Sequence, residues 1–409
     1  MMKLILSPTM NLIAVNTSTL RLGQPLPFAL RNEQGVLLAH KGYIITEREE
    51  ITYWTSRGMT LCVDVDAADN HRAYVGKLYD MVRAEVPLGD IADMQLAASD
   101  LDKTTANEGT GIPDWTALQI RANGLLRDPQ GEQFLPRLEK LYAELHTLVE
   151  QHPDATLCAL MHLSATEVQM YSATHAMLVY VVCSLAAREV LNWPSDQDAT
   201  LGKAALTMNI AMTTLQDELT VQNQALTAKQ IEQVEQHAQR AFSMLVAMGV
   251  DNEDWLLAVR HHHDRAPGPL EAKTVAMRLA RLLQRADTFI ARLSPRTGRL
   301  SMPPNAAMQA CYFDEKQHVD QAGAALIKAV GVYSPGVYVR LANGEVAVVI
   351  RRSANTTAPR VAVIINRDGM PMGEMIVRET NMPTTKIIAH VPHREVKVQV
   401  QLEKLLALI

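Results

Sequence analysis

The sequence of 409 residues has few cysteines, few aromatic residues and no strong excess of charge. None of its cysteines forms a Cys-x-x-Cys pair, which argues against zinc and redox motifs of that type. The four cysteines are Cys62, Cys158, Cys183 and Cys311. We expect them to be buried thiols in a reducing cytoplasm. The net charge of −5 gives no electrostatic reason to expect a nucleic acid or a membrane surface as a partner.

Long apolar runs are also absent. No stretch is long enough to cross a bilayer, and the first residues lack a charged leader followed by an apolar region and a cleavage site. A hydrophobic content of 48% with 20% charged residues is typical of a folded globular protein. The length predicts two or three domains, and we expect a cytoplasmic protein.

The hydrophobic periods predict an α+β multidomain protein, in which a central all-helical domain is flanked by small β-rich modules. Residues 1–66 alternate short apolar runs with turns, and PLPFALRNEQGVLLAHKG indicates a hairpin with its bend at 32–35. A short helix at about 46–57 and the strand TLCVDV follow. Residues 67–130 are a mixed region of helix and linker, in which the polar stretch 99–114 indicates a loop.

Residues 131–332 have the period of helices. Apolar stripes begin near positions 168, 201, 231 and 275. His175 lies on the first stripe, His237 at the edge of the third, and Asp287 close beside the fourth. We therefore expect the inward faces of this helical domain to carry these three side chains.

Residues 333–409 have a period of two and predict a small antiparallel module. Asn343-Gly344 and Asp368-Gly369 each separate two apolar runs, which is the strongest short signal for a hairpin. KVQVQL predicts a further strand, and a short terminal helix follows it.

The stretch RHHHDRAPGPL, residues 260–270, contains three consecutive histidines. A solvated loop explains them as well as a set of metal ligands does. A lone histidine such as His175 or His237 is usually structural. A buried Asp287 needs a partner, and an arginine at 281, 285 or 292 serves as well as a metal ion. Taken together, histidines and a carboxylate on consecutive helices favour an Fe, Mn or Zn site.

The order of these segments resembles the HD-GYP family, helical metal-dependent phosphodiesterases that hydrolyse cyclic di-GMP. The resemblance covers residues 165–330. Five segments carry it, namely YSATHAMLVYVVCSLA, AALTMNIAM, LTAKQIEQVEQHAQRAFSML, VRHHHDRAPG and RADTFIARLSPRTGRLSMPP. Each is weak alone, but their order and spacing together are specific. The resemblance implies a residual metal-ligand set, which consists of His175, His237, His262, His263 and Asp287. It also implies phosphate contacts from Arg296 and Arg299.

The sequence departs from the family at several of its functional positions. Met208-Asn209 replace the signature His-Asp pair, and Met212 replaces the lysine that follows. Tyr171 stands where the family has a carboxylate, and the Gly-Tyr-Pro loop is missing after Gly268. Further changes are Ala211 for a glycine, Asp264 for a glutamate and Gly298 for a tyrosine.

These departures predict the loss of the two-metal centre. A two-metal phosphodiesterase needs a carboxylate that bridges its ions, and the neutral Asn209 cannot supply one. The thioether of Met208 is too soft for Mn or Fe. We therefore expect no catalytic residues and either no cofactor or one Fe, Mn or Zn ion held by His237, His262 and His263.

Three functions remain open. The first is a degenerate, non-catalytic HD-GYP-like regulator of bacterial cyclic di-GMP signalling that acts through an unknown protein partner. The second is a cyclic di-GMP receptor that binds without turnover through Arg296 and Arg299. The third is a residual metal-dependent phosphodiesterase or phosphohydrolase. Met208-Asn209 and the missing Gly-Tyr-Pro loop favour the first. We expect no nucleic-acid or membrane partner, and exposed β edges allow a homodimer.

Overall fold

The structure is a computed structural model. It describes residues 113–129, 133–166, 170–294, 302–398 and 400–409, and in the N-terminal part residues 12–14, 22, 26, 30–32, 37–39, 43–55 and 61–64. The chain divides into two compact units, Met1–Ile120 and Arg121–Ile409. The expected loop at 99–114 falls almost wholly outside the described residues. The four predicted domain boundaries stay a prediction.

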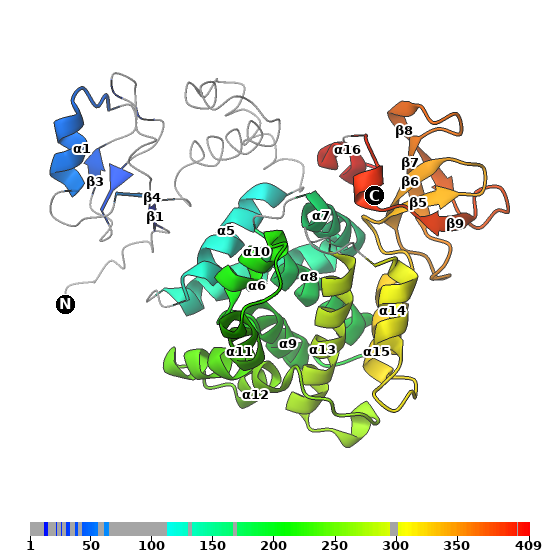
Figure 1. Ribbon diagram of the computed structural model, residues 1–409, viewed down its shortest axis with the longest axis horizontal. Coiled ribbons are helices and arrows are strands. Elements are labelled where there is room, and N and C mark those ends of the chain that lie inside the picture. Colours follow the sequence, from blue (N-terminus) through cyan, green and yellow to red (C-terminus); the bar gives the residue numbers. More distant parts are fainter. Residues whose placement is uncertain are drawn as a thin grey trace, which may run out of the picture. The chain divides into compact units, whose positions relative to one another are not determined.

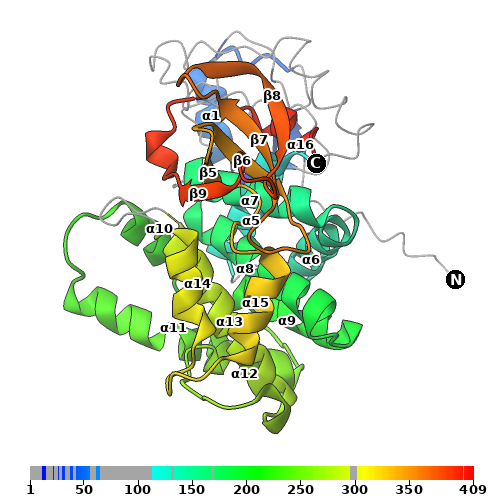
Figure 2. The same cartoon turned by 90° about the vertical axis from the view of Figure 1, so that its right-hand side faces the viewer.

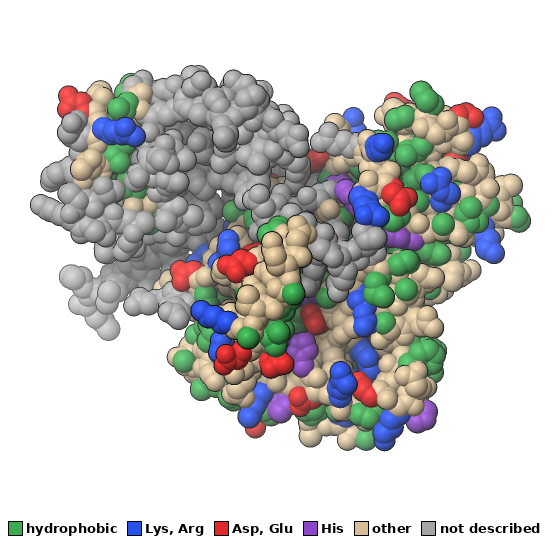
Figure 3. Space-filling view, viewed as in Figure 1, with side chains coloured by type: hydrophobic (Ala, Val, Ile, Leu, Met, Phe, Trp, Pro, Cys, Tyr) green, Lys and Arg blue, Asp and Glu red, His purple; other side chains and the backbone are tan. Residues whose placement is uncertain are grey.

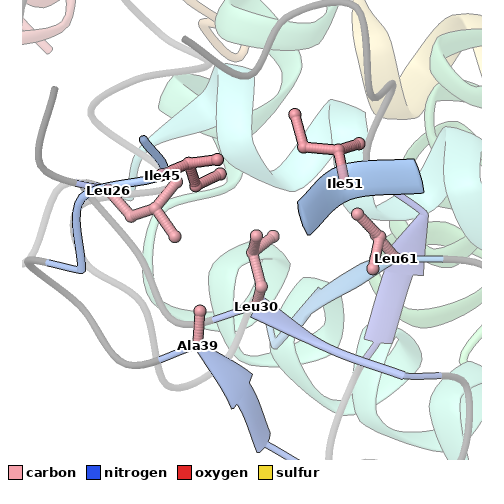
Figure 4. Close-up of a cluster of buried hydrophobic side chains, with 6 residues drawn as sticks. All are labelled: Leu26, Leu30, Ala39, Ile45, Ile51 and Leu61. Atoms are coloured by element: carbon pink, nitrogen blue, oxygen red, sulfur yellow. The ribbon is translucent and has the colours of Figure 1, made fainter. Parts of the chain in front are cut away.

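The first unit contains a small antiparallel sheet in the order β1-β4-β2-β3. Its elements are β1 (Leu12–Ala14), β2 (Leu30–Arg31), β3 (Leu37–Ala39), α1 (Arg48–Thr55) and β4 (Cys62–Asp64). The predicted hairpin, short helix and strand are all present. Six buried apolar side chains fill the space between them (Figure 4), namely Leu26, Leu30, Ala39, Ile45, Ile51 and Leu61.

Helices dominate the second unit up to residue 330, as the sequence predicts (Figure 1). The first helices are α5 (Trp115–Arg127), which begins in the first unit, α6 (Phe134–Gln151), α7 (Pro153–Thr166), α8 (Tyr171–Leu185) with the π-helical turn η3 (Ala186–Val190), α9 (Ser195–Thr207) and α10 (Thr213–Val221). The later ones are α11 (Ala228–Ala247), α12 (Glu253–His261), the short 3-10 helix η4 (Leu270–Ala272), α13 (Val275–Leu293), α14 (Pro304–Tyr312) and α15 (Gln321–Val330).

Helix α8 lies at the centre of this domain. It contacts α7, α9, α10, α13 and α15, and every one of its residues is buried. The predicted apolar stripe is therefore part of a helix that is apolar nearly all round, which is typical of a core helix. Tyr171–Val190 has the length and composition of a membrane span, but 83% of the tested window is buried inside the fold.

The C-terminal residues form a five-stranded antiparallel sheet in the order β8-β7-β6-β5-β9 (Figure 2). Its strands are β5 (Tyr338–Leu341), β6 (Val346–Arg351), β7 (Arg360–Ile365), β8 (Pro371–Glu379) and β9 (Ile387–His390). After β9 come the 3-10 turn η5 (His393–Glu395) and the terminal helix α16 (Leu402–Leu406). Both predicted hairpins are confirmed, and Gly344 and Gly369 adopt the positive φ that their turns require.

One predicted strand is wrong. The described residues of KVQVQL, 397–402, contain no strand, and the fifth strand is β9. Ile387 and its neighbours pair with β5. Both segments carry two β-branched residues, so strand propensity does not choose between them. The pairing with β5 decides which segment forms the strand.

Arg352, just after β6, joins this sheet to the helices. Its guanidinium donates to Asp154 at 2.7 Å and to Glu189 at 2.8 Å, and also to the Ala329 carbonyl that ends α15. The side chain is only 14% exposed. Because a planar guanidinium with several fixed donors specifies geometry, this contact fixes how the sheet lies on the helical domain.

Candidate functional site

Two helices bring three histidines together. His237 lies at the middle of α11, whose start is fixed by a capping box between Thr227 and Gln230. His262 is the C-cap residue of α12, and His263 follows it. The indole N–H of Trp255 in α12 donates to the Thr207 hydroxyl at 2.9 Å, which holds α12 against α9.

The imidazoles of these residues converge on one point. The Nε2 atom of His237 lies 3.2 Å from Nε2 of His262 and 3.1 Å from Nε2 of His263. The potential ligand atoms of the three residues all lie within 4.8 Å of one another. His237 and His262 are buried, whereas His263 is exposed, so the cluster reaches the surface on one side.

The tautomers of two rings follow from their backbone contacts. Nδ1 of His237 lies 2.5 Å from the Val234 carbonyl oxygen, and Nδ1 of His262 lies 2.6 Å from that of Val259. A carbonyl can only accept, so each Nδ1 carries the proton and each Nε2 presents a lone pair. Two lone pairs at 3.2 Å cannot bond to each other.

Protonation of one of these Nε2 atoms does not relieve their repulsion at neutral pH. Burial, together with the neighbouring imidazoles of His263 and His237, lowers the pKa of His262 to about 3. Burial also lowers the pKa of His237, and the His263 imidazole acts in the same direction. Both rings are therefore neutral, which is the form that binds a metal ion.

The cluster fits a metal ion. Nitrogens at 2.0–2.1 Å from a tetrahedral zinc ion lie about 3.3 Å apart, close to the two shortest separations here. The hydrogen bonds from Nδ1 to Val234 and Val259 are the outer contacts that orient metal-bound imidazoles. His237, His262 and His263 would hold the ion.

The other two members of the predicted ligand set are bound to each other. Nε2 of His175 lies 2.8 Å from Oδ1 of Asp287, and the His175 side chain is 1% exposed. Burial alone would raise the pKa of Asp287, but the hydrogen bond and charge of His175 lower it well below its usual range. The imidazoles of His262 and His263 act in the same direction, so the pair and the cluster lie within electrostatic reach of each other.

The partner of Asp287 is thus a histidine, and the sequence offered three arginines for this role. Arg281 binds Glu315 and Asp320 on the α14–α15 connection, and Arg285 also reaches Asp320. The sequence could not identify His175, because 112 positions separate it from Asp287.

Tyr171, Met208 and Asn209, where the resemblance implies further ligands, are buried near the start of α8 and the end of α9. Tyr171 stacks on His175, and its hydroxyl lies 3.4 Å from Nδ1 of that ring. Met208 is 0% exposed. Asn209, at 8% exposure, has a buried Oδ1 with no hydrogen-bond partner among the described residues. Met212 is the residue before α10.

The loop after the three histidines is held by contacts to two helices. Lys273 donates to the carbonyls of Ala266 and Pro267, and Gln284 of α13 donates to that of Asp264. His261 pairs instead with the exposed Asp264 carboxylate at 2.7 Å. Arg296 and Arg299, the predicted phosphate contacts, lie outside the described residues, so their predicted role stays a prediction.

Comparison with known proteins finds a family that resembles this region. The model of the HD domain matches residues 158–323, which include the three-histidine cluster and the His175–Asp287 pair. This part of the chain is therefore similar to an HD domain. HD domains usually bind divalent metal ions, and the histidine cluster offers a site for such an ion.

Two individual proteins are similar to the chain. It is 28% identical over 246 residues to the cyclic di-GMP phosphodiesterase PA4108 of Pseudomonas aeruginosa, and the match covers 58% of each chain. The chain thus spans less than two thirds of that relative. Among solved structures, Bd1817, an HDG"Y"P protein from Bdellovibrio bacteriovorus, matches 77% of this chain and 98% of its own with 13% identity and a TM-score of 0.42.

Proposed function

We propose that this chain is a regulatory HD-domain protein of bacterial cyclic di-GMP signalling that holds one metal ion and does not hydrolyse the dinucleotide. It acts in the cytoplasm through contacts with other proteins. Its HD domain and its similarity to a cyclic di-GMP phosphodiesterase support the signalling context. The buried free thiols agree with a reducing compartment.

The direct bond between His175 and Asp287 carries the proposal. Nε2 of His175 and Oδ1 of Asp287 are engaged with each other, which withdraws both atoms from a second metal ion. Met208 and Asn209 stand where the HD-GYP signature has its His-Asp pair, so the carboxylate that would bridge two ions is replaced by a neutral amide. Hydrolysis by a two-metal centre needs that bridge, because it holds both ions and offsets their charge.

The remaining half of the site supports metal binding without turnover. A metal ion bound there would act as a Lewis acid toward a water molecule. Among the described residues, the cluster itself contains three imidazoles and no carboxylate. The bound ion would then fix α11 and the end of α12 relative to each other. This would keep the surface that these helices present to a protein partner in one conformation.

The test combines metal analysis with a hydrolysis assay on the purified full chain. We expect one metal ion per chain and no linear dinucleotide from cyclic di-GMP. The double variant Met208→His with Asn209→Asp should raise the metal content to two, because it returns an imidazole and a bridging carboxylate. His261→Ala is the matched control, since His261 lies beside the cluster but pairs with Asp264.

Two outcomes contradict the proposal. Two ions in the unmodified chain, or turnover that His262→Ala abolishes, would identify an active phosphodiesterase. Calorimetric titration separates the remaining possibility, since micromolar binding of cyclic di-GMP without turnover would make the protein a receptor for the dinucleotide.

A further inference from the structure

A second group of metal-binding side chains lines a cleft between the helical domain and the C-terminal sheet. On the helical side, the cleft is lined by the C-terminal ends of α7 and α13 and the first residue of α14. On the other side it is lined by β5, β9 and η5. Its volume of about 50 Å³ is well below the 300–1,000 Å³ of sites for organic ligands. It exceeds the ~30 Å³ share of one water, so the space suits an ion.

Four of the lining residues carry donor atoms that transition metals bind. His390 ends β9, and His393 begins η5 three positions later. Met161 comes from α7, and Met302 precedes α14. Figure 3 shows histidine side chains both over the helical part and beside the C-terminal sheet. In the cleft, the two histidines come from the sheet side and the two methionines from the helical side.

The backbone and the aromatic neighbours hold the histidines in place. The Val391 N–H donates to the Tyr338 carbonyl at 2.9 Å and fixes the turn between the two histidines. The His393 ring packs edge-on against Tyr338 and His162, with centroids 5.3 and 6.3 Å away. At Gly336, an added Cβ would lie 2.6 Å from Cβ of Met161, so β5 begins in tight contact with α7.

The donor atoms of the cleft select the kind of ion. Within the described part of the chain, neither imidazole makes a hydrogen bond. The described lining residues include no carboxylate. Hard dications prefer oxygen ligands with negative charge, whereas neutral imidazole and thioether donors suit a soft monovalent ion.

We propose that this cleft binds one copper(I) ion through the imidazoles of His390 and His393 and the thioether sulfurs of Met161 and Met302. The ion would join β9 and η5 to α7 and to the segment before α14. Met302 is 38% exposed and gives the ion a path from solvent. The site is independent of the three-histidine cluster in residues and in preferred metal.

The test is an anaerobic titration of the full chain with copper(I) against the chromogenic chelator bicinchoninate. We expect one equivalent of copper(I) to be retained at a chelator concentration that strips the double variant His390→Ala with His393→Ala. The variant His263→Ala, which disables the other cluster, should retain this equivalent. X-ray absorption should show sulfur as well as nitrogen around the copper.

Met302→Leu makes the test specific, because it keeps the volume of a half-exposed side chain and removes only the sulfur. We expect it to weaken copper(I) binding at least tenfold and to leave any zinc binding unchanged. The proposal is overturned if Met302→Leu binds copper(I) as tightly as the unmodified chain, if only nitrogen and oxygen surround the copper, or if the double variant, folded by circular dichroism, retains the copper.

Discussion

The three-histidine cluster and the His175–Asp287 pair lie in the one region that matches the HD domain, but they satisfy their polar atoms in opposite ways. In the cluster, Nε2 lone pairs of His237 and His262 face each other at 3.2 Å. In the pair, a ring nitrogen faces a carboxylate at 2.8 Å. A cation would satisfy the first arrangement, whereas the second is complete as it stands. The comparison teaches that one half of the site fits a metal ion and that in the other half two side chains bind each other.

The largest expected effect comes from breaking the pair. Asp287→Ala should lower the free energy of unfolding by about 3–5 kcal/mol, because it leaves the buried His175 without its partner. The metal content should not change. Chemical denaturation with metal analysis measures both quantities.

The exposed pair of His261 and Asp264 supplies a matched control, since it joins the same two residue types at 2.7 Å. The side chain of Asp264 is 53% exposed, so Asp264→Ala should cost less than about 1 kcal/mol. Loss of the metal ion in Asp287→Ala would mean that the two halves form a single centre.

Metal removal should produce the next largest loss of stability. This loss should depend on the three-histidine cluster alone. A ligand at 100 times its Kd stabilises the folded state by about 2.7 kcal/mol, so a chelator should lower the Tm of the loaded chain by several degrees. His262→Ala should abolish this response. A chelator effect of the same size in His262→Ala would place the ion elsewhere in the chain.

Local chemistry made much of this fold predictable from the sequence. The helical domain follows from apolar residues at helical spacing, and both C-terminal hairpins follow from Asn343-Gly344 and Asp368-Gly369. His262 and His263 are adjacent, so the sequence could place them at one point. The failures concern distant pairing. KVQVQL alternates like a strand, but a strand forms only where an edge accepts it, and β5 pairs with β9 instead. The partner of Asp287 was equally a matter of tertiary contact.

The tautomers of the cluster were also beyond the reach of the sequence. They depend on the carbonyls of Val234 and Val259, which lie three positions before His237 and His262. In a regular helix such carbonyls bond within the backbone, so a histidine in this spacing gives no signal by itself. A pattern of residues can therefore suggest ligands, but the direction of their lone pairs comes from the folded backbone.

The pH dependence of the metal-free chain distinguishes the halves with a smaller effect. His262 has a pKa of about 3 in the folded state and about 6.5 in the unfolded chain. Below pH 6.5 the His262 imidazole binds a proton in the unfolded state but not in the folded state. Stability should therefore be full above pH 6.5 and fall as the pH falls, by about 2 kcal/mol at pH 5 for this residue.

Urea unfolding with a chelator at pH 7.5, 6 and 5 measures this loss. His262→Gln is the comparison, because glutamine is polar but does not titrate, and its stability should fall less over the same range. Equal pH dependence in both chains would mean that His262 is not desolvated in the folded state.

The smallest expected effect tests whether Tyr171 keeps the second half of the site closed. Its hydroxyl lies 3.4 Å from Nδ1 of His175, a long separation for a hydrogen bond. Tyr171→Phe should therefore change the free energy of unfolding by less than about 1 kcal/mol and leave one metal ion per chain. Tyr171→Glu is the contrasting variant, because it returns a carboxylate one turn before His175. If Asp287 and His175 hold each other as firmly as their contact indicates, this carboxylate alone should not recruit a second ion. A rise to two ions in Tyr171→Glu would show that the His175–Asp287 pair opens readily. The lack of a carboxylate at position 171, more than the contact between His175 and Asp287, would then explain why the second half of the site binds no ion.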